Sequence, residues 1–256
     1  MNQSRETLDV LFGGRLSLYQ SRSGYRFSID ALLLANYVSI KRGDRVIDLG
    51  TGNAVIPLVL AQLHPSAAFV GIELQASMAE RARRNVRLNG LERRVRIISG
   101  DVRRPQTLGA AAVFDVAVCN PPYRTPSSGR ISANHERQMS RHEMTGDLND
   151  FLRAGAFLLR DKGRMALVYP AVRSADLIFA LRQARIEPKR LRMVHSFQDA
   201  EASLLLVEGL KGGRAGVKIQ PPLVIYGDDK KFTDEAAAII AGPPHSAQEE
   251  SLPVKF

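Results

Sequence analysis

Short apolar runs alternate with longer stretches of helical periodicity along most of this chain. Each run is rich in branched apolar residues and ends in an acid, an asparagine or a turn, as expected for a buried strand. Strands that alternate with helices indicate parallel strands joined by crossover helices. The pattern therefore predicts an α/β fold with a doubly wound, mostly parallel sheet of seven strands, the last two forming a hairpin pair. The expected strands are 44–48, 68–72, 95–98, 113–118, 163–169, 191–195 and 203–207, and the expected helices include 54–63, 78–88, 150–159 and 175–184.

The chain is expected to form one main domain with a short piece at each end. Residues 1–23 contain two apolar runs separated by glycines, which predict a hairpin packed on that domain. Residues 24–242 carry the alternating strand and helix pattern. Residues 243–256 are expected to be a disordered tail. We find no internal repeat and no second domain in the pattern.

Three other segments of the main domain have an expected local structure. The leucine-rich segment 31–35 predicts a short helix capped by Ser28 or Asp30. Residues 124–147 are polar and predict a loop beside the functional site. Residues 209–216 contain several glycines and basic residues, which predict a flexible basic segment.

Polar residues follow four consecutive strands of the predicted sheet. The first three strands lead to Asp48, Glu73 and Asp101, and the fourth leads to the segment Asn120-Pro121-Pro122-Tyr123. In a doubly wound sheet the carboxyl ends of the parallel strands line one crevice, and ligands bind there. The repetition at four strand ends therefore predicts a ligand site at this edge.

A glycine turn follows the first of these strands. Gly50 and Gly52 would let the backbone approach a ligand closely, and the following helix would offer free backbone amides at its start, with Asn53 as its cap. Ala54 stands before the helix without the third glycine of a dinucleotide-binding turn. The turn alone is therefore a weak signal, and its position in the series gives it weight.

The segment Asn120-Pro121-Pro122-Tyr123 suits a flat group that carries an amino nitrogen. The Asn120 side-chain oxygen and a neighbouring backbone carbonyl can accept both hydrogens of an NH₂ group. Proline has no N–H and holds the residue before it extended, so acceptors converge without competing donors. Tyr123 would supply a stacking face for a base. The alternative is an ordinary turn that closes a strand.

Composition narrows the class of protein. The 256 residues carry a net charge of +10, which favours a polyanionic partner such as nucleic acid over a merely well-solvated basic surface. One cysteine excludes an intrachain disulfide framework and a cysteine-based zinc site. His142 beside Glu143 lacks metal-ligand spacing, so we expect no metal and a role in loop ordering or RNA contact. No signal peptide or long apolar span is evident, which predicts a cytoplasmic protein without membrane contact.

The succession of Asp48-Leu49-Gly50-Thr51-Gly52, Glu73, Asp101 and Asn120-Pro121-Pro122-Tyr123 resembles the class I S-adenosylmethionine-dependent methyltransferases, which have a Rossmann-like fold. The asparagine–proline tetrad is similar to that of amino-methyltransferases that act on adenine N6, cytosine N4 or a protein glutamine. More specifically, the chain resembles the bacterial N6-adenine methyltransferases that act on A37 of valine tRNA. This closer resemblance rests on Tyr25 to Leu34, on Arg141-His142-Glu143 and on the segment around Tyr226, Thr233 and Glu235.

The resemblance implies a role for each matching residue, with S-adenosylmethionine as the cofactor and tRNA as the partner. Asn120, the carbonyl of Pro121, Pro122 and Tyr123 would form the catalytic segment that holds the target amino group and stacks on its base. The glycine turn would pass under the methionine part of the cofactor, and acids at the strand ends would bind its ribose and adenine. The cofactor-binding residues implied are Phe27, Ser28, Asp30, Asp48, Gly50, Thr51, Gly52, Asn53, Glu73, Leu74, Asp101, Val102 and Asn120.

Several alternatives remain open on the sequence alone. The target adenine could belong to ribosomal RNA or DNA, since the tetrad does not distinguish the polymer. A protein glutamine N5-methyltransferase is disfavoured because only some forty residues precede Asp48, too few for the helical substrate domain such enzymes usually carry. A non-catalytic RNA-binding module is disfavoured by the presence of Asn120 and Tyr123. The arginines of 81–104 are candidates for phosphate contact, of which we expect a minority to touch RNA. The pattern gives no indication of the oligomeric state.

Overall fold

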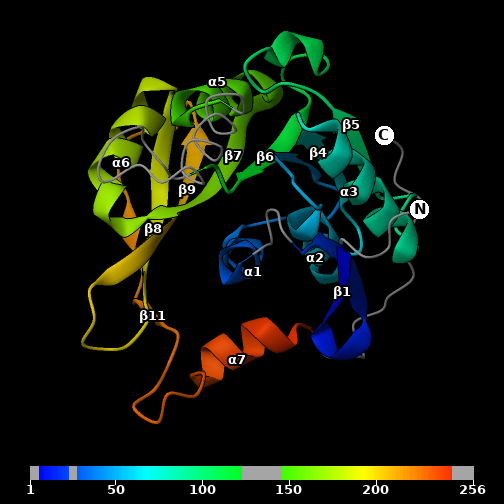
Figure 1. Cartoon of the computed structure of the whole chain (residues 1–256). Helices are drawn as coiled ribbons and strands as arrows, with labels where there is room; N and C mark the ends of the chain where they lie inside the picture. The colour runs from blue at the N-terminus through cyan, green and yellow to red at the C-terminus, as the bar shows by residue number, and fades with distance from the viewer. Residues whose placement is uncertain (1–5, 23–27, 123–145, 244–256) are drawn as a thin grey trace, which may run out of the picture.

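The computed structural model describes residues 6–22, 28–122 and 146–243, and it contains a central mixed sheet (Figure 1). Within this part of the chain the sheet has nine strands in the order β10-β8-β9-β7-β6-β3-β4-β5, with β11 paired to β8. Strand β9 is antiparallel to both of its neighbours, and the other pairs are parallel. The strands are β3 (Arg45–Leu49), β4 (Ala68–Glu73), β5 (Val95–Ser99), β6 (Phe114–Cys119), β7 (Leu159–Pro170), β8 (Ile186–His195), β9 (Ala202–Lys211), β10 (Lys218–Ile219) and β11 (Leu223–Val224).

The expected α/β architecture is confirmed, and all seven expected strands are present. The two additional strands, β10 and β11, have two residues each and lie beside β8. The expected flexible segment at 209–216 is wrong in its first part, because β9 continues to Lys211. Those residues pair with the start of β8, which begins earlier than the apolar pattern indicates.

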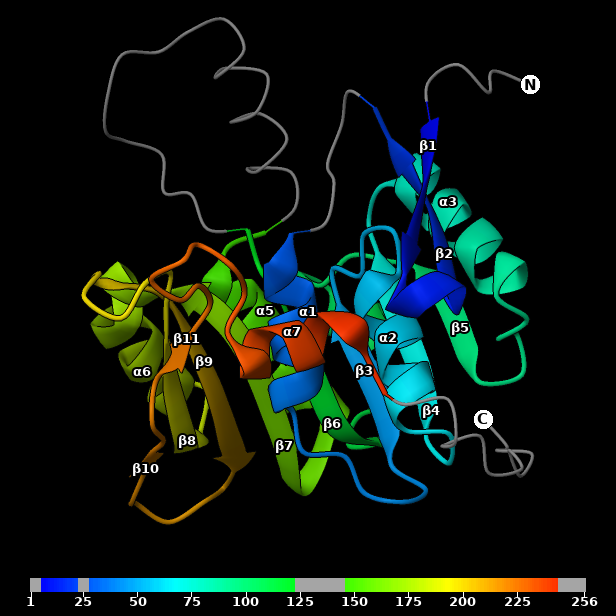
Figure 2. The same cartoon turned by 90° about the horizontal axis from the view of Figure 1, so that it is seen from below.

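Helices cover both faces of the sheet (Figures 1 and 2). One face carries α1 (Ile29–Tyr37), α2 (Val55–Leu63) and α3 (Ala76–Leu88), and its buried residues form one apolar cluster. The opposite face carries α5 (Leu148–Leu158) and α6 (Ser174–Gln183), whose residues form a second cluster. Successive strand residues divide between the two faces, since Val116 and Val118 join the first cluster while Ala117 and Cys119 join the second.

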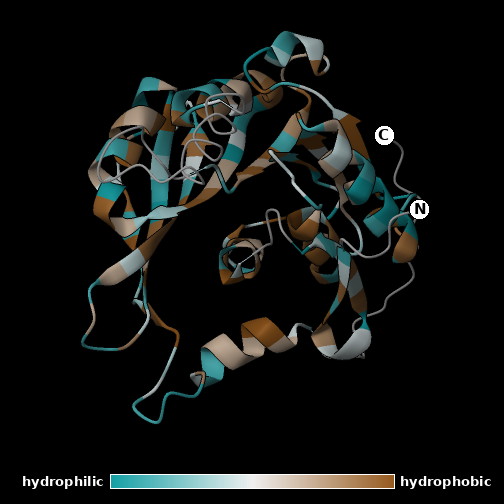
Figure 3. Ribbon diagram, in the orientation of Figure 1, coloured by the Kyte–Doolittle hydropathy of each residue, from teal (hydrophilic) through white to brown (hydrophobic). Residues whose placement is uncertain are grey.

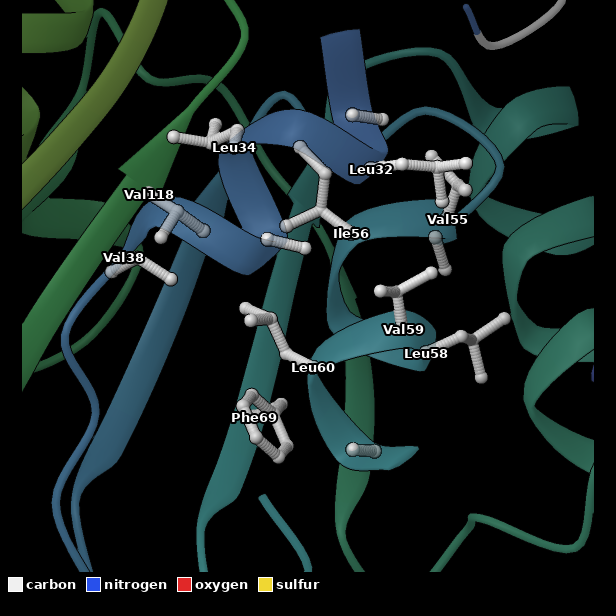
Figure 4. Close-up of a cluster of buried hydrophobic side chains, with 14 of the residues drawn as sticks. Leu32, Leu34, Val38, Val55, Ile56, Leu58, Val59, Leu60, Phe69 and Val118 are labelled. Carbon is white, nitrogen blue, oxygen red and sulfur yellow. The ribbon is translucent and has the colours of Figure 1, made fainter. Parts of the chain in front are cut away.

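The first cluster is built mainly from α1 and α2 (Figure 4). Leu32 and Leu34 of α1 pack with Ile56 and Leu60 of α2, above Phe69 of β4. Each of these side chains is almost completely buried, and burial of one such chain is favourable by roughly 1.5–3 kcal/mol. Helix α2 is therefore hydrophobic over most of its surface, whereas α3 is mostly hydrophilic on its outer side (Figure 3).

The start of α1 differs from the expected capping. Ser28 is the residue before the helix, but its side chain accepts no hydrogen bond from the first turn. Asp30 lies inside the first turn and not at the cap position. Packing of the apolar residues therefore holds α1 in place, in line with the dominance of tertiary contacts over local signals in short helices.

The expected N-terminal hairpin is present. Strands β1 (Glu6–Leu11) and β2 (Leu16–Ser21) pair in antiparallel fashion, and a 3₁₀ turn at Phe12–Gly14 connects them. The hairpin lies beside α3 and α2 (Figure 2), and Leu16 and Leu18 are completely buried in the first cluster. It is therefore integrated with the main domain.

Helix α7 (Asp234–Ala241) closes the described part of the chain. The Thr233 side chain caps it by accepting from the amide of Ala236. The helix crosses below α1 and reaches the hairpin (Figure 1), where the Arg15 guanidinium donates to the carbonyl of Ala241 at 3.1 Å. The expected tail, 243–256, lies outside the described residues after position 243.

Candidate active site

The acids that follow the strands do meet at one edge of the sheet. Asp48 of β3 is level with Gly71 of β4 on one side and with Val118 of β6 on the other. Glu73 lies two residues beyond Gly71, at the end of β4, and Asn120 lies two residues beyond Val118, directly after β6. Glu73 and Asn120 are therefore at the same edge of the sheet as Asp48. The carboxyl ends of β3 to β6 therefore share the edge at which a doubly wound sheet binds its ligand.

Several polar atoms at this edge are buried and lack a hydrogen-bond partner in the described part of the chain. They are both carboxylate oxygens of Asp48, the hydroxyl oxygen of Thr51 and the side-chain nitrogen of Asn53. Buried polar atoms without partners are uncommon and unfavourable, so such a group of them indicates a place for a ligand. Together they offer anionic and neutral acceptors and one amide donor, which fits the charged amino-acid end of S-adenosylmethionine.

The turn between β3 and α2 has a left-handed backbone at three positions. Gly50 and Gly52 have φ values of 76° and 58°, and Ala54 has a φ of 66°. Ala54, and not Asn53, is the residue that precedes α2, so the expected cap by Asn53 is wrong. Ala54 thus takes a left-handed conformation that favours glycine and is unfavourable by roughly 1–2 kcal/mol for a residue with a Cβ.

Glu73 lies at the end of β4 and holds the glycine turn. Its carboxylate accepts from the backbone amide of Gly52 at 2.9 Å and from that of Gln75 at 2.8 Å. Burial raises the pKa of Glu73 above its usual range. Leu74, which follows it, is half-buried. The acid is therefore a structural element of the turn.

Asp101 lies two residues beyond the end of β5 and pairs with Arg103. The Arg103 guanidinium donates to both carboxylate oxygens at 2.7–3.0 Å, and its backbone amide donates to one of them. The hydrogen bond from the Arg103 side chain is the main reason that the pKa of Asp101 is below its usual range. Val102 is buried in the second apolar cluster and anchors this short segment.

The carboxyl group of Asp48 is strongly perturbed by its surroundings. Burial raises its pKa to about 7, and the nearby Glu73 adds to this rise. The Thr51 hydroxyl opposes the rise from close by, although it is not in hydrogen-bonding geometry. Cys119, one strand away, is completely buried, and burial raises the pKa of its thiol.

The catalytic segment expected from the sequence is described in part. Asn120 follows β6 directly and is half-buried, Pro121 is buried and Pro122 is half-buried. Tyr123, Phe27 and the expected loop with His142 and Glu143 lie outside the described residues. Ser28 is exposed at the start of α1, followed by the half-buried Asp30.

Two residues of α3 that the sequence reasoning did not assign to the cofactor turn also contact it. Asn85 of α3 donates to the carbonyl of Asn53 at 2.9 Å, and Arg81 donates to the Asn53 side chain at 3.4 Å. Asn85 is completely buried, on the same stripe of α3 as Ala82 and Val86. An asparagine on the apolar stripe of an otherwise basic helix was the available signal.

Comparison with known proteins agrees with this geometry. The profile of a family described as a methyltransferase domain matches residues 40–202. A solved structure, a predicted O-methyltransferase from Agrobacterium tumefaciens, superposes with a TM-score of 0.69 at 24% identity and covers 82% of this chain and 94% of its own. A geranyl diphosphate methyltransferase in complex with S-adenosylmethionine superposes with a TM-score of 0.52 at 16% identity, over 71% of this chain and 84% of its own.

The fold and the strand-end site thus define a class I methyltransferase, an enzyme whose cofactor is S-adenosylmethionine. A curated relative from Porphyromonas gingivalis is 31% identical over 206 residues, 78% of this chain and 80% of its own. Another, from Haemophilus influenzae, is 26% identical over 228 residues, 84% of this chain and 89% of its own. Both are named tRNA1(Val) (adenine(37)-N6)-methyltransferase, and the chain belongs to the family of these relatives.

Two other findings concern the described residues only. No group of three or more histidine, cysteine or acidic side chains there could hold a metal ion. None of the helices seen in that part of the chain has both the length and the apolar composition needed to cross a membrane.

Proposed function

We propose that this enzyme transfers a methyl group to N6 of an adenine in RNA, and that its substrate is A37 of a valine tRNA. The observation that carries the proposal is the position of Asn120-Pro121-Pro122 directly after β6, beside the buried unpartnered carboxylate of Asp48. The names of the relatives support the substrate, since they are described as acting on this nucleotide.

Each residue of the edge has a proposed part in binding. Asp48, Thr51 and Asn53, with Gly50 and Gly52, receive the methionine portion of S-adenosylmethionine. Glu73 and Leu74 lie at its ribose, Asp101 and Val102 at its adenine, and Phe27, Ser28 and Asp30 close the methionine end. When bound, the cofactor supplies an activated methyl group.

The chain's own contribution to the reaction is the positioning of the amino group. An exocyclic adenine amine is a poor nucleophile because its lone pair is delocalised into the ring. The Asn120 side-chain oxygen and the Pro121 carbonyl accept its two N–H groups, which favours a more tetrahedral nitrogen with its lone pair exposed. Asn120 is uncharged and is not a strong base, so positioning and electrostatics supply the acceleration and the proton leaves after transfer.

The base must stand outside any stack to reach this edge. A nucleotide in an anticodon loop is already partly splayed, whereas one in a duplex must first be flipped out. In this proposal Tyr123, the last residue of the tetrad, stacks on the extruded base. The net charge of +10 supports a polyanionic substrate. We also propose that residues 24–242 form the methyltransferase domain, with 1–23 as an N-terminal extension.

The test is methyl transfer from radiolabelled S-adenosylmethionine to separate pools of unmodified tRNA, ribosomal RNA, DNA and release factor. Label on tRNA that digests to N6-methyladenosine is the expected result, and loss of label on a valine tRNA with A37 replaced by guanosine would locate it. Label on ribosomal RNA or DNA alone would move the substrate to another adenine. Label on protein alone would favour glutamine, and cofactor binding without label on any pool would favour a binding module.

A further inference from the structure

Helix α3 is hydrogen-bonded both to the N-terminal hairpin and to the cofactor turn. The inference drawn from this connection concerns cofactor binding and does not depend on which RNA is the substrate. Asn85 of α3 and Asn89, the residue that directly follows this helix, face strand β2 of the hairpin. The Asn85 amide accepts from the backbone N–H of Tyr19 at 2.8 Å and donates to its carbonyl at 3.1 Å. Asn89 does the same with Ser17, at 2.9 and 2.8 Å.

This pairing has a simple geometric basis. Ser17 and Tyr19 are two residues apart on β2, a separation of about 6.7 Å along a strand. Asn85 and Asn89 are four residues apart, on the last turn of α3 and directly after it, a separation of about 6 Å along a helix. The two side-chain amides therefore match two backbone groups of β2 and act as a partner for its open edge.

Only one of the two asparagines goes further. The Asn85 side-chain nitrogen also donates to the carbonyl of Asn53 at 2.9 Å. The third bond of Asn89 runs instead to the carbonyl of Asn85, at 2.7 Å. The Asn53 carbonyl belongs to the peptide that leads into Ala54, the residue with the left-handed φ of 66°. The Asn85 bond thus fixes the peptide whose conformation is least favourable in the cofactor turn.

The two arginines of α3 that pair with the hairpin repeat this asymmetry. Arg81 and Arg84 both bind the Glu6 carboxylate of β1, at 2.7 and 2.6 Å. Arg81 also reaches the Asn53 side-chain oxygen at 3.4 Å, and Arg84 does not contact the turn. With its oxygen engaged, the Asn53 amide presents its buried, unpartnered nitrogen.

We propose that Asn85 and Arg81 are positioning residues for S-adenosylmethionine. They hold the peptide and the side chain of Asn53 in the binding conformation, and both also bond the hairpin. An alanine at position 54 is thus kept in a left-handed conformation that favours glycine by a bond from the neighbouring helix.

The test compares matched variants of the full chain by calorimetric titration with S-adenosylmethionine and by thermal unfolding. Asn85→Ala and Asn89→Ala each loosen the hairpin, and both should lower Tm. Only Asn85→Ala should weaken cofactor binding, by about tenfold or more, whereas Asn89→Ala should stay within about twofold. Equal weakening in the two variants, or none in either, would overturn the proposal.

A second pair decides the matter if Asn85→Ala does not fold. Arg81→Gln and Arg84→Gln each leave Glu6 with one arginine, so their stabilities should be similar. Arg81→Gln should weaken cofactor binding about threefold or more, and Arg84→Gln should not. If the two variants bind the cofactor equally, Arg81 has no role in the turn.

A double variant separates positioning from general stability. Ala54→Gly removes the unfavourable Cβ from the left-handed position, so it should restore part of the cofactor affinity lost in Asn85→Ala while leaving the hairpin loose. Additive effects of the two substitutions would contradict the proposal. Because every readout is cofactor binding in the absence of nucleic acid, failure here leaves the proposed RNA substrate untouched, and the reverse also holds.

Discussion

The amide of Asn120 is the single group on which the proposed chemistry depends most directly. Asn120→Ala should lower kcat for RNA methylation by about a hundredfold or more, because one of two acceptors for the amino group is lost. Binding of S-adenosylmethionine and of tRNA should change little. Asn120→Asp keeps an acceptor oxygen and should retain more activity than the alanine variant. Single-turnover rates measure this, and an unchanged rate for Asn120→Ala would show that the amide takes no part.

Asp48 should make cofactor binding depend on pH. Its pKa of about 7 means that it is protonated below neutrality in the free enzyme. A positively charged cofactor amine favours the carboxylate, so affinity should rise as pH increases towards 7 and level off above it. Below pH 7 the dissociation constant should increase about tenfold per pH unit.

The raised pKa of Asp48 also determines how the stability of the fold changes with pH. The unfolded chain releases the Asp48 proton near the ordinary value of 3.8, while the folded chain keeps it until about 7. The contribution of Asp48 to stability in the absence of cofactor therefore falls as pH rises between these values. Asp48→Asn should remove both effects, which calorimetry and urea unfolding at pH 5 to 8 would detect. A cofactor affinity that still changes with pH in Asp48→Asn would assign the titration to another group.

At the scale of single residues the sequence predicted which residues end the strands, but not their backbone conformations or side-chain partners. Asp48, Glu73 and Asn120 could be found because a strand's end and its polar residue are both local features. The left-handed Ala54 could not, since an alanine carries no such preference and a bond from Asn85 on another element holds it. The pairing of Asp101 with Arg103 is likewise a matter of side-chain geometry.

The contact between β4 and the cofactor turn allows a test at the level of elements. A Cβ on Gly71 would lie 2.7 Å from the hydroxyl oxygen of Thr51 and 2.9 Å from a methyl carbon of Ile97. Gly71→Ala should therefore displace the turn, weaken cofactor binding and lower the free energy of unfolding by roughly 1–3 kcal/mol.

Gly227→Ala provides the matched control, because the nearest atom to its added Cβ is 3.5 Å away. Calorimetry and urea unfolding of both variants would measure the difference. If Gly71→Ala bound the cofactor as well as Gly227→Ala, close contact between β4 and the turn would not be needed for binding.

Elements were predicted better than the contacts between them. The hydrophobic pattern predicted all seven main strands and the N-terminal hairpin, because periodicity records which face is buried. Capping signals were less reliable: the Ser28 side chain does not cap α1, Asn53 does not precede α2, and packing fixes those ends. Docking of the hairpin on α3 depends on residues more than sixty positions apart, which local patterns do not reveal.

The positive charge of the whole molecule should contribute most to RNA binding at the edge of the sheet that holds the site. Arg104 follows β5 at this edge, and Arg93 precedes β5 at the other. Both are exposed, and neither side chain makes an ion pair or hydrogen bond with the described residues. Arg104→Ala should weaken tRNA binding and reduce the slope of log K against log salt by about one, while Arg93→Ala should not.

Equilibrium binding of tRNA at several salt concentrations measures these slopes. Equal losses in the two variants would mean that RNA also covers the opposite edge. The sequence alone suggested many arginines as phosphate contacts, and the structure reduces this set, because Arg81 and Arg84 bind Glu6 and Arg103 binds Asp101. Net charge indicates the kind of partner, whereas only the fold shows which charges are already neutralised.

The chain's one cysteine, Cys119, lies completely buried in the central strand β6, directly before Asn120. A buried thiol with a raised pKa does not react with alkylating reagents while the strand stays in place. Its rate of modification therefore reports how often the middle of the sheet opens, without any added probe. The ratio of the alkylation rates of Cys119 without and with cofactor would measure how much a bound ligand protects the site from opening.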